Sequence, residues 1–393
     1  MKKVVKRIFL IMLISIAVFN FGFLICYAAE YSFDYEITDE TETDDTYSTI
    51  SQELIGDDIE KSLPDEAKSI IDDLDIKADN IWSFENIFSA KGFETIIGII
   101  VDYTSLPMKK AAVLLTVILI ISLIYSYKDN NSASDTALSN FASLVCIGTI
   151  MLPISELISD CATVLNALSV FVMTLVPIFA GLLIAAAKSS VAVGFQAPVF
   201  LATNAVSFIA TNIITPLMSI FLALSVAGGV SNEQRLFKIS ASLKKLTTWI
   251  LTISMSIYMA IFSIKNVISS SADNAGMKTA RFLFSSLVPI ISTSINECLS
   301  SMSGCVAVLR NSFGIYALIA LIAIVLPLVI RIIFWRIIIF FASEVADIFL
   351  VDSISEMLKS ISSAIGVLLS VIIIATVMFI FSVTVLSSIG NSL

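Results

Sequence analysis

Apolar stretches long enough to cross a lipid bilayer fill most of the chain after residue 110. A transmembrane helix needs about 20 consecutive, mostly apolar residues. By this length the sequence predicts single spans at 111–127, 137–158, 163–187, 247–269 and 361–386. The pattern therefore indicates an all-α fold, a polytopic helical membrane protein.

Three further apolar stretches are interrupted by proline or by polar residues. Residues 197–230 are broken at Pro216, so two spans or a re-entrant pair are expected there rather than one helix. Residues 282–309 are rich in serine, and residues 313–350 are broken near Pro327. With these Pro-broken helices the predicted count is seven to nine spans.

A recurring motif suggests an internal repeat. Leu175-Val176-Pro177-Ile178 returns as Leu287-Val288-Pro289-Ile290. Residues 138–246 and 250–360 would then be two copies in parallel orientation, as in transporter-like folds whose repeat interface forms the pathway. Chance recurrence is the alternative, because Leu, Val and Ile dominate the chain.

The N-terminal residues have the pattern of a secretory signal peptide. Residues 1–28 combine a basic start, an apolar run and small residues before a cleavage position after Ala28. An uncleaved anchor is the alternative, since the apolar run is long for a signal. Both interpretations place the residues that follow outside the cytoplasm.

Two segments separate this signal from the multi-pass transmembrane domain, residues 107–393. Residues 29–82 are strongly acidic and are expected to be extracytoplasmic, whereas residues 83–106 are amphipathic. We interpret residues 83–106 as a helix on the outer membrane interface, with a helix that binds in a partner's groove as the alternative. If residues 197–230 cross twice, the basic loop 231–246 lies in the cytoplasm, as the positive-inside rule requires.

Composition supports the membrane assignment and argues against nucleic-acid binding. Hydrophobic residues make up 57% of the chain and charged residues 14%, whereas about 25% of a soluble domain is charged. The net charge is −9, and residues 30–90 near the N-terminus alone contribute −16, so the rest of the chain carries +7. Nucleic-acid phosphates need clustered lysine and arginine, so no nucleic-acid partner is expected.

Catalytic signatures are absent from the sequence. The chain contains no histidine, which excludes a Ser–His nucleophile, an H-E-x-x-H zinc site and a histidine proton relay. The five cysteines show no C-x-x-C spacing and are expected to be apolar packing residues. A P-loop and a G-x-S-x-G elbow are also missing. We therefore expect no enzyme, no cofactor and no metal site.

Polar residues inside the apolar stretches are the candidates for function, because ionisable groups are costly in a bilayer. Glu156 and Asp160 lie four residues apart on one face of a helix end, and we interpret them as carboxylates at the outer interface. Asn204 and Asn212 lie inside the Pro-broken region 197–230. They either line a polar cavity or satisfy backbone groups that the proline frees.

A second group of charges lies in the last third of the chain. Arg331 and Arg336 are followed by Glu344 and Asp347, and the spacing allows several of these side chains to share one helix face. Buried pairing would mark a gate in a transport path or a structural lock. At the interface, the arginines would instead extend to lipid headgroups.

Several motifs together resemble a known family. They comprise the signal-like start, the acidic N-terminal segment, Leu175-Val176-Pro177, Phe195-Gln196-Ala197-Pro198, Lys278-Thr279-Ala280-Arg281-Phe282 with Pro289 beyond, and Leu309-Arg310-Asn311-Ser312 before Gly314. In order and spacing they resemble the stage III sporulation protein AE family of endospore-forming bacteria. The likeness covers most of the chain after about residue 84, whereas residues 30–60 match nothing recognisable.

The resemblance implies a multi-pass cell-membrane protein of the mother cell that faces the forespore. It further implies a subunit of a channel or secretion-like complex that connects the two cells and is required for late forespore gene expression. Expected partners are the lipid bilayer, other membrane proteins of the same sporulation operon, a ring-forming complex in the intermembrane space, and further copies of the chain. A stand-alone secondary transporter and a structural membrane scaffold are the alternatives.

Overall fold

The computed structural model describes residues 57–74, 76, 90–126, 134–185, 189–231, 233–258, 260, 292–348 and 351–388. All of them belong to one compact unit, Ser51–Leu393. These residues are helical apart from short turns and contain no strand, which confirms the all-α fold class. The predicted signal peptide and most of the acidic segment lie outside the described residues.

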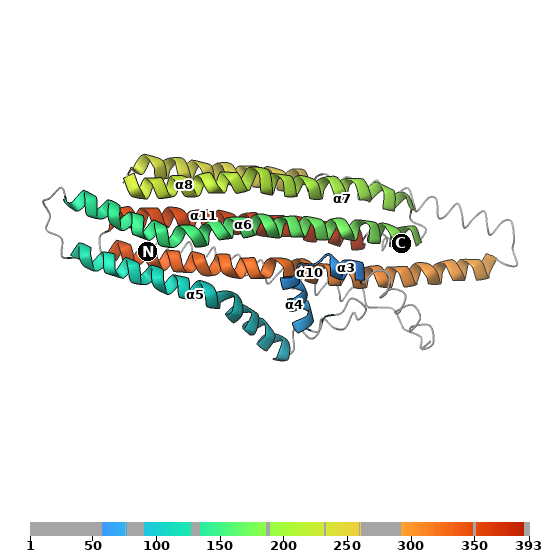
Figure 1. Ribbon diagram of the computed structural model, residues 1–393. Coiled ribbons are helices and arrows are strands. Elements are labelled where there is room, and N and C mark those ends of the chain that lie inside the picture. Colours follow the sequence, from blue (N-terminus) through green and yellow to red (C-terminus); the bar gives the residue numbers. More distant parts are fainter. Residues whose placement is uncertain are drawn as a thin grey trace, which may run out of the picture. The chain divides into compact units, whose positions relative to one another are not determined.

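Long helices make up most of the described chain (Figure 1). Helices α10 and α11 pack along each other, and α6 contacts both. Helix α8 packs on α6 and α11, while α5 contacts α6 and α10. The elements are α3 (Asp57–Lys61), α4 (Asp65–Asp73), α5 (Ala90–Ser126), α6 (Ser134–Ala185), α7 (Ser189–Ile209), the π-helical turn η3 (Ala210–Ile214), α8 (Thr215–Ser231), a helix over 234–258, α10 (Ser292–Ile348) and α11 (Asp352–Ser388).

Four described helices are long and apolar enough to cross a membrane, so the predicted seven to nine spans are not confirmed. A fifth is added if the two bent halves of α5, Glu94–Ser105 and Pro107–Ile121, count as one span. The last part of the predicted span 247–269 and the first part of 282–309 lie outside the residues whose structure is described. The four helices are Phe141–Ala185, Gln196–Ser231, Arg310–Ile348 and Ser353–Ser387.

The lower count arises because helices continue where the sequence predicted breaks. The predicted spans 137–158 and 163–187 are joined in α6, which runs through Pro153 and Pro177. Likewise, α10 runs unbroken through Pro327, where a break was expected. Neighbouring helices can compensate the hydrogen bond that a proline removes, so proline is tolerated inside membrane helices.

The prediction of two spans or a re-entrant pair over 197–230 is also wrong. Residues Gln196–Ser231 form one continuous helical stretch with a π-helical turn, η3, just before Pro216. Proline removes a backbone N–H and its ring crowds the preceding turn, and a π-turn accommodates this without ending the helix. Thr215 helps, since its Oγ1 donates to the Ala210 carbonyl at 3.0 Å.

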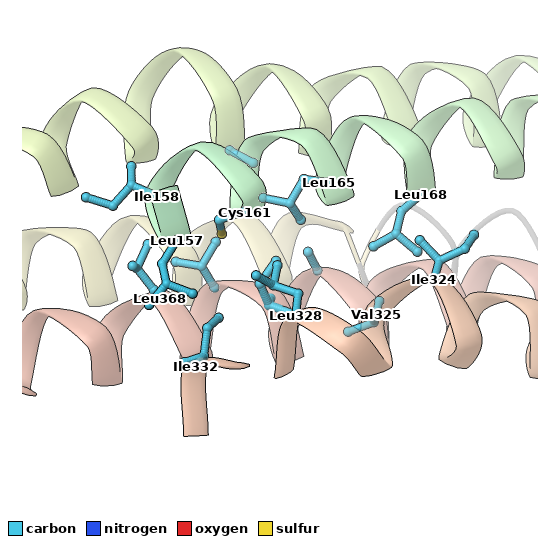
Figure 2. Packing of buried hydrophobic residues seen from close by; sticks show 14 of the residues in the cluster. Leu157, Ile158, Cys161, Leu165, Leu168, Ile324, Val325, Leu328, Ile332 and Leu368 are labelled. Carbon is cyan, nitrogen blue, oxygen red and sulfur yellow. The ribbon is translucent and has the colours of Figure 1, made fainter. Parts of the chain in front are cut away.

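The core between the long helices follows helical spacing. Leu157, Cys161, Leu165 and Leu168 of α6 form a ridge that faces a matching ridge of α10 (Figure 2). Cys161 is a free, buried thiol, as is Cys146, which agrees with their predicted role as packing residues. The facing residues of α10 are Ile324, Val325, Leu328 and Ile332, with Leu368 of α11 beside them.

Two short helices from the acidic segment pack against the bundle. The sequence Leu63-Pro64-Asp65-Glu66 starts α4 with Pro64 at the N-cap, as expected for a proline followed by acidic residues in the first turn. Helix α4 contacts α10, and α3 contacts α6. Their apolar side is buried while their acids stay at the surface; the buried residues are Ile59, Leu63, Ala67, Ile70 and Ile71. Part of the acidic segment is therefore folded onto the bundle.

The internal repeat stays a prediction. In its favour, α7–α8 and α10 each contain a proline in an apolar helix, Pro216 and Pro327, and each is followed by a further helix, 234–258 and α11. Against it, α10 is one helix, whereas the matching part of the first copy is divided between α6 and α7.

Candidate functional site

The main polar feature of the bundle is a cluster of charges where α4, α5, α6 and α10 meet. Arg331 of α10 donates from Nη1 to Oδ2 of Asp160 at 2.8 Å and from Nη2 to Oε1 of Glu66 at 3.4 Å. Its side chain is 28% exposed, against 39% for Asp160. One half-buried guanidinium thus holds together two helices of the bundle and the acidic helix α4.

Two residues of α5 complete this set. The Arg331 guanidinium lies 5.6 Å from the ring centroid of Tyr103, a cation–π contact. Lys110 donates from Nζ to Oε2 of Glu156 at 2.9 Å. We call these six residues the charged cluster: Glu66, Tyr103, Lys110, Glu156, Asp160 and Arg331.

A bend in α5 brings Tyr103 and Lys110 to the same place. The halves Glu94–Ser105 and Pro107–Ile121 meet at 45°. Pro107 explains the bend, because it lacks the N–H of a regular helix and its ring crowds the preceding turn. The predicted interfacial helix 83–106 ends at this bend, and the apolar half of α5 begins there.

A cavity of about 270 Å³ opens beside the charged cluster. Its wall contains five residues of the cluster and, in addition, Asp102, Pro107, Pro153, Leu157 and Trp335. It thus combines two cations, three carboxylates and two aromatic rings. Such a wall suits a small polar or zwitterionic group better than an apolar one. Among the described residues, no group of three or more acidic or cysteine side chains is arranged to hold a metal ion.

The acids of α4 fix where the charged cluster can lie with respect to a membrane. Asp65 and Glu66 are exposed, and Glu66 contacts Arg331. Exposed carboxylates are unstable in hydrocarbon, so this level of the bundle has to face water or lipid headgroups. The interpretation of Glu156 and Asp160 as interface carboxylates fits this geometry, with the addition that each has a basic partner.

The helix lengths agree with this placement. At about 1.5 Å per residue a helix as long as Phe141–Ala185 rises about 68 Å, which is more than twice the ~30 Å of a bilayer core. Glu156 and Asp160 lie near the middle of that stretch. The charged cluster therefore divides this stretch of α6 into two apolar parts of unequal length, 141–155 and 161–185.

The other predicted site residues do not join the charged cluster. Asn204 and Asn212 are exposed and donate from Nδ2 to the backbone carbonyls of Phe200 and Phe208, at 2.9 and 3.3 Å. Neither lines the cavity of the charged cluster, and each bonds to a carbonyl of its own helix four residues earlier, so their use in satisfying groups that Pro216 frees stays a prediction. Pro216 comes just after the π-helical turn η3, and its effect is on the backbone geometry of the helix at that turn.

The charges of α10 point in different directions. Arg331 faces α4, α5 and α6, whereas Arg336 lies against Gly366 of α11. Asp347 pairs with Lys359 of α11, and Glu344 is exposed. The expected sharing of one face by Arg336, Glu344 and Asp347 therefore gives no pairing among these residues.

Sequence reasoning missed Glu66, Tyr103 and Lys110 as members of the site. Lys110 could have been noticed from the sequence, because it is a charge between Pro107 and the start of an apolar run. Its carboxylate partner, Glu156, lies on another helix and could not be predicted. Tyr103 and Glu66 could not be predicted either, because their contact with Arg331 depends on how α4 and α5 pack.

Replacing Lys110 by glutamine is expected to have a small effect. The pair with Glu156 is exposed at both ends, 41% and 54%, so water screens it. Exposed pairs contribute at most about 1 kcal/mol. Unfolding of the purified protein in mixed detergent micelles should detect a loss below that value, and a larger loss would mean that Lys110 is buried in the native protein.

Comparisons with known proteins agree on one family. The sequence model described as stage III sporulation protein AE matches residues 83–390. The stage III sporulation protein AE of Bacillus subtilis (strain 168) is 21% identical over 228 residues, which cover 58% of this chain and 57% of that protein. The match thus spans less than two thirds of that relative. No solved structure matches.

Proposed function

Because the chain belongs to the stage III sporulation protein AE family, we propose that it is a membrane subunit of a channel or secretion-like complex between mother cell and forespore. In this proposal the complex is required for late forespore gene expression. The family match over residues 83–390 is the observation that carries the proposal, and it covers four apolar helices that can cross a membrane.

The proposed orientation puts the N-terminal segment outside the cytoplasm, with the chain in the mother-cell membrane facing the forespore. Arg235, Lys238, Lys244 and Lys245 make the 231–246 region the most basic part of the bundle, and basic segments favour the cytoplasm. The acidic α4 lies at the charged cluster, where Glu66 contacts Arg331. Acidic segments do not favour the cytoplasm as basic ones do, so the distribution of charge along the sequence supports the orientation.

Helices α3 and α4 give the proposal a docking element. Their exposed acids stand at the charged cluster, where they are available to partner proteins in the intermembrane space, while their apolar side is held by the bundle. We propose that operon-encoded membrane proteins and ring-forming proteins bind at this level. The residue that holds the element in place is Arg331, through Glu66.

The test is a crosslinking pull-down of the tagged full chain from sporulating cells, read by mass spectrometry. We expect membrane proteins of the same operon and ring-forming intermembrane proteins in the wild-type sample. The matched sample comes from a variant with Asp65→Asn and Glu66→Gln. It should lose the intermembrane proteins more readily than the membrane proteins of the operon. Recovery of the chain alone, or only with itself, would contradict the channel proposal and favour a stand-alone transporter.

A structural scaffold makes a different prediction for the same sample. A scaffold would also recover partners, but charge changes in the bundle would not alter function as long as the complex assembles. Sporulation efficiency measured beside the pull-down separates the two. Loss of sporulation in an Arg331→Gln strain whose complex assembles would exclude a pure scaffold.

A further inference from the structure

The cavity beside the charged cluster has the size and the polar wall of a ligand site. Its volume of about 270 Å³ is close to the lower end of ordinary ligand sites, roughly 300–1,000 Å³. It therefore fits a small molecule or the polar end of a larger one. Residues of α5, α6 and α10 form the wall, and the space lies where α5 bends by 45° at Pro107.

The two cations of the wall have hydrogen-bond donors that the protein does not use. Lys110 carries three N–H donors, and one of them bonds to Glu156 at 2.9 Å. Arg331 carries five, and its bonds to Asp160 and Glu66 use two of them within the described part of the chain. Both side chains are partly exposed, 41% and 28%. The cavity therefore offers donors to a phosphate, which accepts strong bonds from Lys and Arg.

The carboxylates of the wall outnumber its cations by one. The two acids of α6 pair with the two cations. Asp102 of α5 is the third carboxylate; it is exposed and has no ion pair among the described residues. An ionised carboxylate only accepts hydrogen bonds, so Asp102 suits an ammonium group. The described acids are not arranged to hold a metal ion, so an organic ammonium is the cation that fits.

The aromatic rings of the wall favour a primary ammonium over a quaternary one. A quaternary ammonium has no N–H and binds chiefly to the faces of aromatic rings. Here the Arg331 guanidinium already lies over the Tyr103 ring, 5.6 Å from its centroid. Trp335 is only 4% exposed. Recognition of the ammonium therefore falls to the Asp102 carboxylate, which needs an N–H donor.

Exposed apolar side chains stand next to this polar wall. Met108 and Val113, 59% and 57% exposed, follow Pro107 on the apolar half of α5. Leu152 of α6 is 68% exposed and precedes Pro153, which lines the cavity. In a membrane such side chains contact acyl chains, while the charged cluster lies at the level of water and headgroups. A lipid contacts both surfaces, whereas a soluble zwitterion would contact only the polar one.

We propose that the cavity binds the headgroup of a zwitterionic phospholipid with a primary ammonium group, of the ethanolamine type. The phosphate accepts hydrogen bonds from Lys110 and Arg331, and the ammonium donates to Asp102. The acyl chains lie along the exposed apolar side chains of α5 and α6. An anionic headgroup is disfavoured, because the third carboxylate of the wall repels it. The inference goes beyond the proposed function and does not depend on it.

Native mass spectrometry of the purified full chain tests the choice of lipid. The protein in detergent receives equal amounts of three phospholipids that share their acyl chains and carry ethanolamine, choline or glycerol headgroups. The ethanolamine lipid should be retained at least about five-fold more than either of the others, the effect of one partly exposed charge contact. Equal retention of the three lipids would overturn the proposal.

Variants of α5 test whether the lipid occupies this cavity. Asp102→Asn and Lys110→Gln should each lower retention of the ethanolamine lipid by about five-fold. Glu94→Gln and Lys109→Gln are the matched controls, because they remove the same charges at exposed positions of α5 outside the cavity wall. Retention in the controls should stay at the wild-type level. Equal retention in the site and control variants would overturn the assignment of the lipid to the cavity.

A soluble competitor separates a lipid from a free zwitterion. Glycerophosphoethanolamine carries the same phosphate and ammonium but has no acyl chains. At the concentration at which the lipid saturates the protein, it should displace less than about a tenth of the bound lipid, because burial of the chains contributes to affinity. Full displacement would overturn the lipid and assign the cavity to a soluble zwitterion. The result is independent of the pull-down, which reports on partner proteins only.

Discussion

Replacing Arg331 by glutamine is expected to lower the free energy of unfolding by about 1–3 kcal/mol. The change removes the hydrogen-bonded ion pair with Asp160 at 2.8 Å and the longer contact with Glu66 at 3.4 Å, and leaves both carboxylates beside each other without their cation. The value lies between those of exposed and of fully buried pairs, because the Arg331 side chain is 28% exposed. Reversible unfolding in mixed detergent micelles measures it.

Two comparisons make this result specific to the charged cluster. Lys110→Gln should cost clearly less, since its pair with Glu156 is more exposed. A double-mutant cycle between Arg331→Gln and Asp160→Asn should give a coupling of about 0.5–3 kcal/mol, because residues in one ion-pair network are not additive. Additive losses, or a loss no larger than that of Lys110→Gln, would mean that the two side chains do not meet in the native protein.

The fold class could be predicted from the sequence because it depends on a property that each segment carries by itself. Stretches such as 163–187 are apolar along their whole length, and in lipid a backbone of that kind has to be helical. The number of spans depends instead on where helices end. Glu156 and Asp160, just after Pro153, are interpreted from the sequence as part of a helix end, yet Lys110 and Arg331 pair with the two carboxylates and the helix continues.

Pro216 shows the same limit for backbone geometry. Whether a proline ends a helix or is absorbed by a π-turn depends on neighbours such as the Thr215 hydroxyl, which bonds to the Ala210 carbonyl. Local sequence gives the position of the irregularity but not its form. The predicted break and the observed turn therefore fall at the same place with different consequences for topology.

The candidate site could be predicted only in part. Asp160 and Arg331 stood out singly, as charges within apolar stretches, but they are far apart in the sequence and nothing local pairs them. The same holds for Lys244 and Arg336, which approach Ser363 and Gly366 of α11 from two different helices. Pairs of this kind depend on helix packing, which periodicity does not determine.

Close packing of α8 on α11 allows a sharp test of the arrangement. Helix α8 ends next to the start of α11, where Oγ of Ser353 donates to the Gly229 carbonyl at 2.8 Å. A Cβ added at Gly229 would lie 2.9 Å from Cβ and 2.7 Å from Cγ of Met357. Atoms so near the backbone of α11 cannot move aside as a flexible side-chain tip can, so the two helices would have to separate.

Gly229→Ala is therefore expected to lower the free energy of unfolding by about 1–3 kcal/mol, the usual cost of overpacking a core. Small residues at such crossings let membrane helices approach closely, and alanine would remove that fit although it is the better helix former. Gly148→Ala is the matched control, because no heavy atom lies within 4 Å of its added Cβ. That variant should be neutral or up to about 1 kcal/mol more stable. Both glycines lie in apolar helices, so helix propensity acts alike on the two. Equal stability of the two variants would mean that α8 and α11 do not touch at Gly229.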